Sequence, residues 1–465
     1  MMRSMFSVVS GLRSHQTKMD VIGNNIANVN TIGYKAGRVT FREIFSQTIK
    51  APSAPDANTG RGGTNPMQIG LGIEVSSIDT NMARGTVQRT DVITDLSIEG
   101  EGFFVVRESS SDPYKFTRAG NFRVDELGNL VTGNGMAVCG WLEYTISDKG
   151  EYIFNTINQL ESINIYNDSI NGNKRLIRAQ ATTQATFAGN LSANSLPIPE
   201  ADRTIDNAHY ITPVTVYSPI GKEYKVNICF WRGPSESYTI TDESGNTVNK
   251  IATQWHWRAV GDVNNSDVLD LPSAEGELLF DDEGNILFVD PTSTPIDGYT
   301  VTPTIRIDSG VASGSKPFEI KLDFKSLSMF ATVSSVKPIS RDGYPAGSMT
   351  SYSISQDGII MGIYSNGQQQ PLGMIGLAVF DNPSGLAKVG NNLFEPTANS
   401  GEFRRGIQPG TEDAGRLNPG TLEMSNVDLS QEFIDMIVTQ RGFQANSRIV
   451  TATDEMLQEM VNIRR

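Results

Sequence analysis

The chain has few of the residues that build metal centres and disulfide frameworks. Its 465 residues include two cysteines and three histidines. Cys139 and Cys229 are too few for a disulfide framework or for a four-ligand zinc site. His15, His209 and His256 lie far apart in the sequence. We therefore expect no metal site, no cofactor and no catalytic residues.

Positive charge and long apolar runs are also scarce. Lys and Arg number 38 against 52 Asp and Glu, a formal net charge of −14, so phosphate-rich nucleic acid would be repelled. No stretch approaches the roughly 18 apolar residues that a membrane-spanning helix needs, so we expect no membrane insertion. The first residues show no apolar region followed by a small-residue cleavage site, and we expect no cleaved signal peptide.

Length and turn-forming residues indicate the fold class. A chain of 465 residues is longer than one hydrophobic core usually holds, so several domains are expected. The 44 glycines, 21 prolines and 38% hydrophobic residues favour strands joined by tight turns. We predict a mainly β protein with long terminal α-helices and with nested β-domains inserted between them.

The N-terminal segment carries apolar residues at alternating spacings of three and four. This periodicity predicts a helix with a coiled-coil seam, interrupted by the polar His15. The asparagines and glycine that follow weaken a helix, so we expect its end between Gly23 and Asn30. The predicted seam residues of this helix are Met5, Val8, Leu12, Met19, Ile22 and Ile26.

A second helix is predicted at the C-terminal end. Asp428 is its expected N-cap, with Gln431 as the capping-box partner, and the helix runs for roughly 35 residues. A seam this narrow needs a partner helix. The two terminal helices therefore pair either with each other in one monomer or across copies in an assembly. The predicted seam residues of this helix are Leu429, Phe433, Met436, Phe443, Ile449, Met456, Met460 and Ile463.

Between the helices the pattern is one of strands and turns. Ala51 to Pro66 has a linker composition, and two strands flank the turn Ser218–Gly221. The regions before and after a tryptophan-containing middle share their turn chemistry, which suggests an insertion. The predicted divisions are a helical domain of 1–30 with 425–465, a connecting region of 31–72, a β-domain of 73–145 with 326–424, and an inserted outer β-domain of 146–325.

Searches for catalytic patterns yield weak candidates. His256 between Trp255 and Trp257 could belong to a sugar-stacking or general-base site, but an alternating strand explains the same residues. A carbohydrate-active enzyme would need a pair of carboxylates aimed at a cleft, and the acidic residues here lie in predicted turns. Cys229 shares a strand face with Lys225, but four residues of strand span about 13 Å, too far for a bond within one chain.

Both ends of the chain carry motifs that resemble a known family. Met19–Lys35 and Ser425–Ser447 resemble the terminal signatures of the bacterial flagellar rod and hook proteins, and Thr94–Phe104 and Tyr364–Gly367 are similar to motifs of their bodies. The residues that carry the signatures are Asn24, Asn25, Ala27, Asn28, Asn30, Gly33, Tyr34, Asn426, Val427, Asp428, Gln440 and Arg441.

The middle of the chain resembles the hook-type members of this family. Rod-type members are generally shorter. Similarity to hook-type segments is found at Leu322–Phe324 and Asp342–Gly347. In contrast, Ser218–Ile220 departs from the sequence that is usual in hook-type members. The resemblance implies a structural subunit of the flagellar hook, which polymerises into a flexible curved tube and passes torque from rod to filament. The alternative is a distal rod protein of the basal body.

The resemblance also implies the position of each domain in the assembly and the partners of the subunit. The terminal helices would line the inner tube wall and pack on neighbouring subunits, and the two β-domains would form the middle and outer shells. The implied partners are further hook subunits, the distal rod protein, the hook cap, the hook–filament junction protein and the flagellar type III export apparatus. The implied location is the extracellular part of the flagellum. The resemblance leaves open whether Cys139 or Cys229 joins an intersubunit crosslink.

Overall fold

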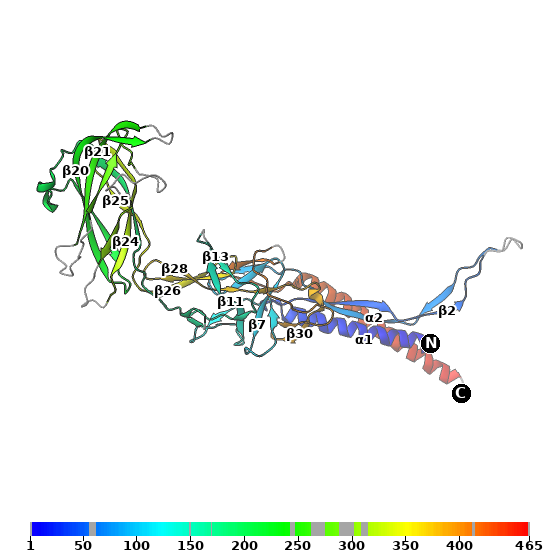
Figure 1. Ribbon diagram of the computed structural model, residues 1–465. Coiled ribbons are helices and arrows are strands. Elements are labelled where there is room, and N and C mark those ends of the chain that lie inside the picture. The colour runs from blue at the N-terminus through cyan, green and yellow to red at the C-terminus, as the bar shows by residue number, and fades with distance from the viewer. Residues whose placement is uncertain are drawn as a thin grey trace. The chain divides into compact units, whose positions relative to one another are not determined.

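The structure is a computed structural model (Figure 1). It describes residues 2–463 except 55–61, 148–149, 169, 242–246, 262–274, 288–301, 308–314 and 412–413. The chain is mainly β, with one long helix near each end, which confirms the predicted fold class. Within the described residues no helix is both long and apolar enough to cross a lipid bilayer.

The chain divides into two compact units. The first comprises Met1–Lys174, Ser351–Gly362 and Gln369–Arg465, and the second comprises Arg175–Thr350 with Ile363–Gln368. The second unit thus begins and ends later than the inserted domain predicted at 146–325. The reason lies in the strand partners: β12 (Tyr144–Ile146) pairs with β13 (Tyr152–Phe154) inside the first unit, and β25 (Lys337–Arg341) pairs with β18 (Gln184–Ser192) inside the second.

Two helices of the first unit lie side by side and antiparallel (Figure 1): α1 (Met2–Ala27) and α2 (Leu429–Ile463). Helix α1 ends within the predicted interval, where the Asn28 side-chain amide donates to the Asn24 carbonyl at 2.9 Å. The predicted N-cap of α2 is confirmed, since Asp428 Oδ1 accepts from the Ser430 amide at 2.8 Å. Half of the predicted capping box is present: the Gln431 amide donates to Asp428 Oδ1 at 3.3 Å, while the Gln431 side chain donates to Asp435 Oδ2 at 3.2 Å.

Two antiparallel strand pairs follow α1. Strand β1 (Gly37–Glu43) pairs with β4 (Ile73–Thr80), and β2 (Ser46–Lys50) pairs with β3 (Met67–Gly70). Three of these strands lie in the region 31–72 that was predicted to be a connecting segment, and part of its predicted linker, 55–61, lies outside the described residues. Helix α1 packs on this ribbon, with the His15 ring 5.9 Å from the Phe41 ring.

The body of the first unit is a twisted sheet. Neighbouring strands run in the order β28 (Gln369–Ile375), β11 (Ala137–Trp141), β7 (Phe103–Arg107), β8 (Lys115–Thr117), β31 (Leu393–Glu395) and β30 (Ala387–Gly390). Its buried core includes Phe103, Phe116, Trp141 and Phe380. The other strands of this region are β5 (Val87–Arg89), β6 (Leu96–Glu99), β9 (Arg123–Val124), β10 (Leu130–Val131), β14 (Glu161–Ser162), β15 (Asn167–Asp168), β16 (Gly172–Asn173), β29 (Leu377–Ala378), β32 (Arg416–Pro419) and β33 (Thr421–Glu423). Two further strands, β26 (Gly347–Ile354) and β27 (Ile359–Tyr364), have residues in both units.

The second unit contains two four-stranded sheets around an aromatic core. One sheet has the order β23 (Thr304–Ile307), β24 (Phe318–Phe330), β18 and β25, and the other has β19 (Tyr210–Tyr217), β20 (Glu223–Thr241), β21 (Thr247–Gly261) and β22 (Glu275–Phe280). The short strand β17 (Leu176–Ile177) also belongs to this unit. The predicted turn joins β19 to β20, with the Gly221 amide donating to the Ser218 carbonyl at 2.8 Å. Trp255 and Trp257 are buried in this core.

Candidate functional site

Small residues bring α1 and α2 together. An added Cβ at Gly11 would lie 2.9 Å from Asn446 Nδ2, and one at Gly442 would lie 2.9 Å from His15 Cε1. Contacts this short exclude any larger side chain unless its neighbour moves. Burial and the nearby Lys18 both lower the pKa of His15, so its ring is neutral at neutral pH. The two helices therefore approach each other closely at these two glycines.

Polar groups hold the same helix pair. Lys18 Nζ lies 3.2 Å from Asp435 Oδ1, and the Asn25 side-chain amide donates to Glu432 Oε1 at 2.9 Å. Thr439 is buried, and its hydroxyl donates to the Asp435 carbonyl of its own helix at 2.7 Å. The pairing of the two helices inside one chain thus includes contacts of small and polar residues.

The predicted seam residues lie in several environments. On α1, Val8 and Ile22 are buried, Leu12, Met19 and Ile26 are half-buried, and Met5 is exposed. On α2, Met436 is half-buried, while Leu429, Phe433, Phe443, Ile449, Met456 and Met460 are exposed; the side chain of Ile463 is outside the described residues. Most of the predicted α2 seam is therefore open to solvent in the single chain.

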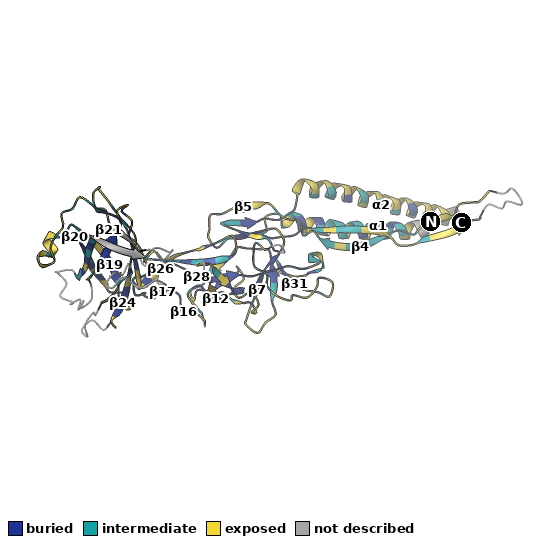
Figure 2. Ribbon diagram, turned by 45° about the horizontal axis from the view of Figure 1, so that its top comes forward, coloured by how far each residue is buried: buried dark blue, intermediate teal, exposed yellow. Residues whose placement is uncertain are grey.

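An apolar stripe runs along the solvent side of α2. Ile434, Val438, Ile449 and Met456 follow at spacings close to whole helical turns, and Ile434 and Val438 are 56% and 61% exposed. Figure 2 shows this side of α2 in the colour of exposed residues. The sequence reasoning missed Ile434, Ile437 and Val438 because it followed a different three–four register. We call the set Phe433, Ile434, Ile437, Val438, Ile449 and Met456 the exposed apolar face of α2.

The signature residues near the helix ends meet in one junction. Asn25 is buried at the end of α1, where its Oδ1 accepts from the Gly37 amide at 2.9 Å and from the Tyr34 hydroxyl at 3.2 Å. Its Nδ2 donates to the Gly37 carbonyl as well as to Glu432. One asparagine thus fixes the end of α1, the start of β1 and the first turn of α2.

Gly33 makes a close backbone approach in this junction. Its φ is +68°, its amide donates to the Glu423 carbonyl at 2.8 Å, and a Cβ would lie 2.7 Å from the Ala119 backbone nitrogen. Both the left-handed backbone and the contact with another backbone require glycine.

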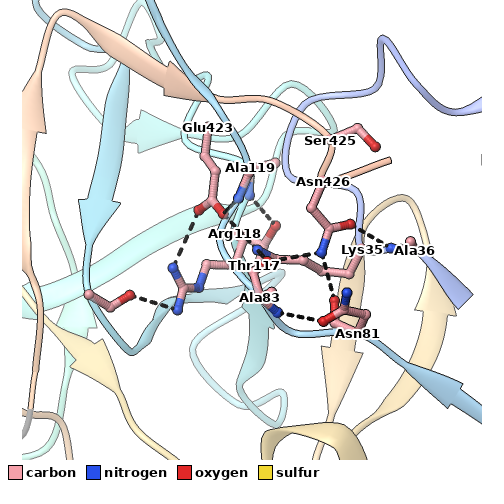
Figure 3. Close-up of polar contacts among 12 residues, drawn as sticks. Lys35, Ala36, Asn81, Ala83, Thr117, Arg118, Ala119, Glu423, Ser425 and Asn426 are labelled. Atoms are coloured by element: carbon pink, nitrogen blue, oxygen red, sulfur yellow. Dashed lines mark hydrogen bonds and ion pairs between the residues drawn. The ribbon is translucent and has the colours of Figure 1, made fainter. Parts of the chain in front are cut away.

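Asn426 bridges the segment before α2 to two other segments. Its Oδ1 accepts from the Ala36 amide at 2.8 Å, and its Nδ2 donates to the carbonyls of Asn81 and Ala83, each at 2.9 Å (Figure 3). The side chain takes the place of a missing strand partner for three backbone groups.

Some of the other signature residues also make hydrogen bonds at the helix ends. Asn28 ties back to Asn24 and accepts from the Thr31 hydroxyl at 3.0 Å, and Asp428 caps α2. Val427 is half-buried, and Ala27, Asn30, Gln440 and Arg441 are exposed.

A buried ion network lies beneath the junction (Figure 3). Lys35 Nζ is 2.6 Å from Glu423 Oε1, and Arg118 Nη1 is 3.3 Å from Glu423 Oε2; the side chains of Lys35 and Glu423 are each 1% exposed. Burial by itself would raise the pKa of the Glu423 carboxyl. The charges of Lys35 and Arg118, with the Gly85 amide, outweigh burial and hold that pKa below its usual value.

Sequence reasoning missed this network. Lys35 appeared only within a motif, and Arg118 and Glu423 were not singled out, because they lie hundreds of residues apart and no local pattern joins them. The available signal was Glu423 itself, a charged residue between the apolar Leu422 and Met424 at the end of the predicted β-domain.

The described residues offer little for metal binding or thiol chemistry. Within that part of the chain, no three His, Cys, Asp or Glu side chains are grouped to hold a metal ion. Cys139 and Cys229 are both buried, and burial raises the pKa of Cys139 to about 12. The arrangement described above suits mechanical coupling of the helix pair to the body sheet.

Comparisons with known proteins match flagellar rod and hook proteins at both ends of the chain and in its middle. Family models match residues 7–35 (flagella basal body rod protein), 97–171 (flagellar hook protein FlgE/F/G D1 domain), 190–344 (flagellar basal body protein FlaE D2 domain) and 418–463 (flagellar basal body rod FlgEFG protein C-terminal). The flagellar hook protein FlgE of Borreliella burgdorferi is 39% identical and that of Treponema pallidum 36%, each with all of both chains covered. The flagellar basal-body rod protein FlgG of Bacillus subtilis is 28% identical, again over all of both chains.

Proposed function

The chain belongs to the flagellar hook protein family and is a structural subunit of the bacterial flagellar hook, and on this premise we propose that the exposed apolar face of α2 is its contact with neighbouring copies. The higher identity to hook proteins than to the rod protein favours the hook over the distal rod.

One observation carries this proposal. The helix pair inside the chain uses glycine and polar residues, which leaves Ile434, Ile437 and Val438 more than half exposed. Burying a side chain of this type recovers on the order of 1–2 kcal/mol. An apolar stripe repeated along a helix marks an interaction surface, and in a polymer a second copy supplies the partner.

The junction explains how such a contact could carry load. Asn25, Gly33 and Asn426 bond the helix ends to the start of β1 and to β33 through backbone groups. A force on the helices therefore passes into the body sheet through many short bonds. We propose that the helices line the inner tube, that the body forms the middle shell and that the inserted domain forms the outer shell.

The remaining assignments rest on family membership. We propose that the subunit leaves the cell through the flagellar type III export apparatus without a cleaved signal peptide. It would then polymerise under the hook cap and join the distal rod protein at one end and the hook–filament junction protein at the other. We propose a structural role without enzymatic activity or cofactor.

A matched pair of variants tests the contact. Val438→Asp places a charge on the exposed apolar face, and Ser447→Asp places the same charge on an exposed polar position nine residues later, on the opposite side of α2. Each monomer should unfold within about 0.5 kcal/mol of wild type, because both sites are on the surface. Negative-stain microscopy should show curved tubes from wild type and Ser447→Asp and none from Val438→Asp. Curved tubes from Val438→Asp would refute the contact, and short straight rods from wild type would favour the rod protein.

A further inference from the structure

Three asparagines of the chain stand directly before a glycine: Asn134, Asn171 and Asn366. An Asn–Gly pair can deamidate spontaneously, because glycine has no Cβ to shield its backbone nitrogen from the asparagine side chain. The sequence alone gives no reason to rank the three pairs. The structure separates them by the hydrogen bonds that hold each asparagine side chain.

The turns at Asn134 and Asn366 have the same backbone arrangement. Gly135 and Gly367 have φ values of +83° and +78°, and the amide of each donates at 2.9 Å to the carbonyl three residues earlier. Backbone conformation and amide hydrogen bonding therefore do not distinguish these two pairs. Any difference in their reactivity has to come from the side chains.

The side chain of Asn366 is held by both of its polar atoms. Its Nδ2 donates to the Pro345 carbonyl at 2.8 Å, and its Oδ1 accepts from the Gln368 amide at 3.1 Å. Asn134 is exposed, and its side chain makes no hydrogen bond with the described residues. Deamidation brings Cγ of the asparagine to the next backbone nitrogen, so the bonds of Asn366 have to break first and Asn134 has none to break.

Asn171 is restrained as well. Its Nδ2 donates to the Leu142 carbonyl and to Asp168 Oδ2, each at 3.1 Å. Its backbone amide donates to the same carboxylate, and the residue is half-buried. Of these three described asparagines, Asn134 is therefore the one that can react without first losing a side-chain hydrogen bond.

We propose that Asn134 is a site of spontaneous deamidation in the folded chain. The Gly135 backbone nitrogen attacks Asn134 Cγ, and the proton of that nitrogen passes to water or hydroxide. The side-chain nitrogen leaves as ammonia, and the product is a five-membered succinimide ring. Water then opens the ring to give aspartate or isoaspartate. In sum, one side-chain amide and one water become one carboxylic acid and one ammonia.

The modified turn borders a polar pocket of the first unit. The pocket has a volume of about 290 Å³, and its walls include Asn134, Asn392, Thr31 and Ile32, the last of which directly precedes Gly33 of the junction. None of the side chains that line it is charged. Deamidation would therefore place a negative charge in a neutral pocket beside the junction.

Peptide mapping by mass spectrometry tests the ranking. The folded, full-length chain is held at pH 8 and 37 °C, and the conversion of each Asn–Gly pair to aspartate and isoaspartate is followed over time. We expect Asn134 to convert about tenfold faster than Asn366 or Asn171, since two hydrogen bonds of ordinary strength correspond to roughly that factor. Equal rates at the three sites, or a slower rate at Asn134, would overturn the proposal.

The unfolded chain is the control for local sequence. In concentrated urea the side-chain hydrogen bonds are absent, so the three pairs should convert at similar rates. A preference for Asn134 that persisted in urea would show that neighbouring residues cause it, and this too would overturn the proposal. Asn134→Gln should abolish conversion at its own site, because glutamine would have to close a larger ring, and should leave the rates at Asn171 and Asn366 unchanged.

Discussion

Asn25, Gly33 and Asn426 act through backbone groups that the ends of helices and strands leave unpaired. The first and last turns of a helix leave several amides and carbonyls without helical partners. Asn25 and Asn426 each bond to three or more groups there, and Gly33 lets two backbones approach. These residues were predicted as a family signature, but their bonds could not be, since each partner depends on the tertiary fold.

Glu423→Gln should be among the most destabilising single substitutions in the chain. It leaves Lys35 and Arg118 buried without their carboxylate, and breaking a buried ion pair in this way typically costs about 3–5 kcal/mol. Urea unfolding at pH 7 should show the loss as a lower free energy of unfolding. Glu126→Gln, at an exposed turn, is the matched control and should change little.

The same variant has a predicted pH dependence. The Glu423 pKa is held below its usual value in the fold, so its ionised form adds stability above the unfolded value of about 4.3. That contribution disappears as pH falls through the lower, folded value. The difference between wild type and Glu423→Gln should therefore shrink from pH 5 downward. A difference that stayed constant down to pH 2 would contradict the assigned role of the carboxylate.

The two terminal helices show what periodicity can and cannot predict. Their existence and ends followed from local signals, such as the apolar spacing and the Asp428 cap. Their contact face did not, because apolar periodicity cannot detect a contact made at Gly11 and Gly442. The predicted seam and the observed helix contact therefore use different sides of α2.

Two glycine substitutions should have opposite effects on the helices. Gly442→Ala adds a Cβ at 2.9 Å from the His15 ring and should destabilise the helix pair by about 1–3 kcal/mol through overpacking. Gly23→Ala meets no atom within 4 Å and should stabilise α1 by up to about 1 kcal/mol. Thermal unfolding followed by circular dichroism at 222 nm measures both. Shifts of the same sign in the two variants would show that the helices do not pack as described.

The division of the whole molecule was only partly predictable. Turn-rich composition and repeated turn chemistry predicted a mainly β chain with an insertion. The limits of the second unit depend on long-range pairing, such as the parallel ladder in which Gln184 of β18 lies opposite Lys321 of β24. No local pattern specifies which of many similar strands will pair across such a separation, so the predicted limits of 146 and 325 stay a proposal for the outer domain.

The burial of the exposed apolar face of α2 in the polymer is the central claim for the whole assembly. A single cysteine at Val438, 61% exposed in the chain, reports on it directly. The native Cys139 and Cys229 are buried and contribute little background. Maleimide should modify Val438→Cys rapidly in the monomer and roughly a hundredfold more slowly in assembled tubes, where labelling requires a local opening. Equal labelling rates in monomer and tubes would contradict the account.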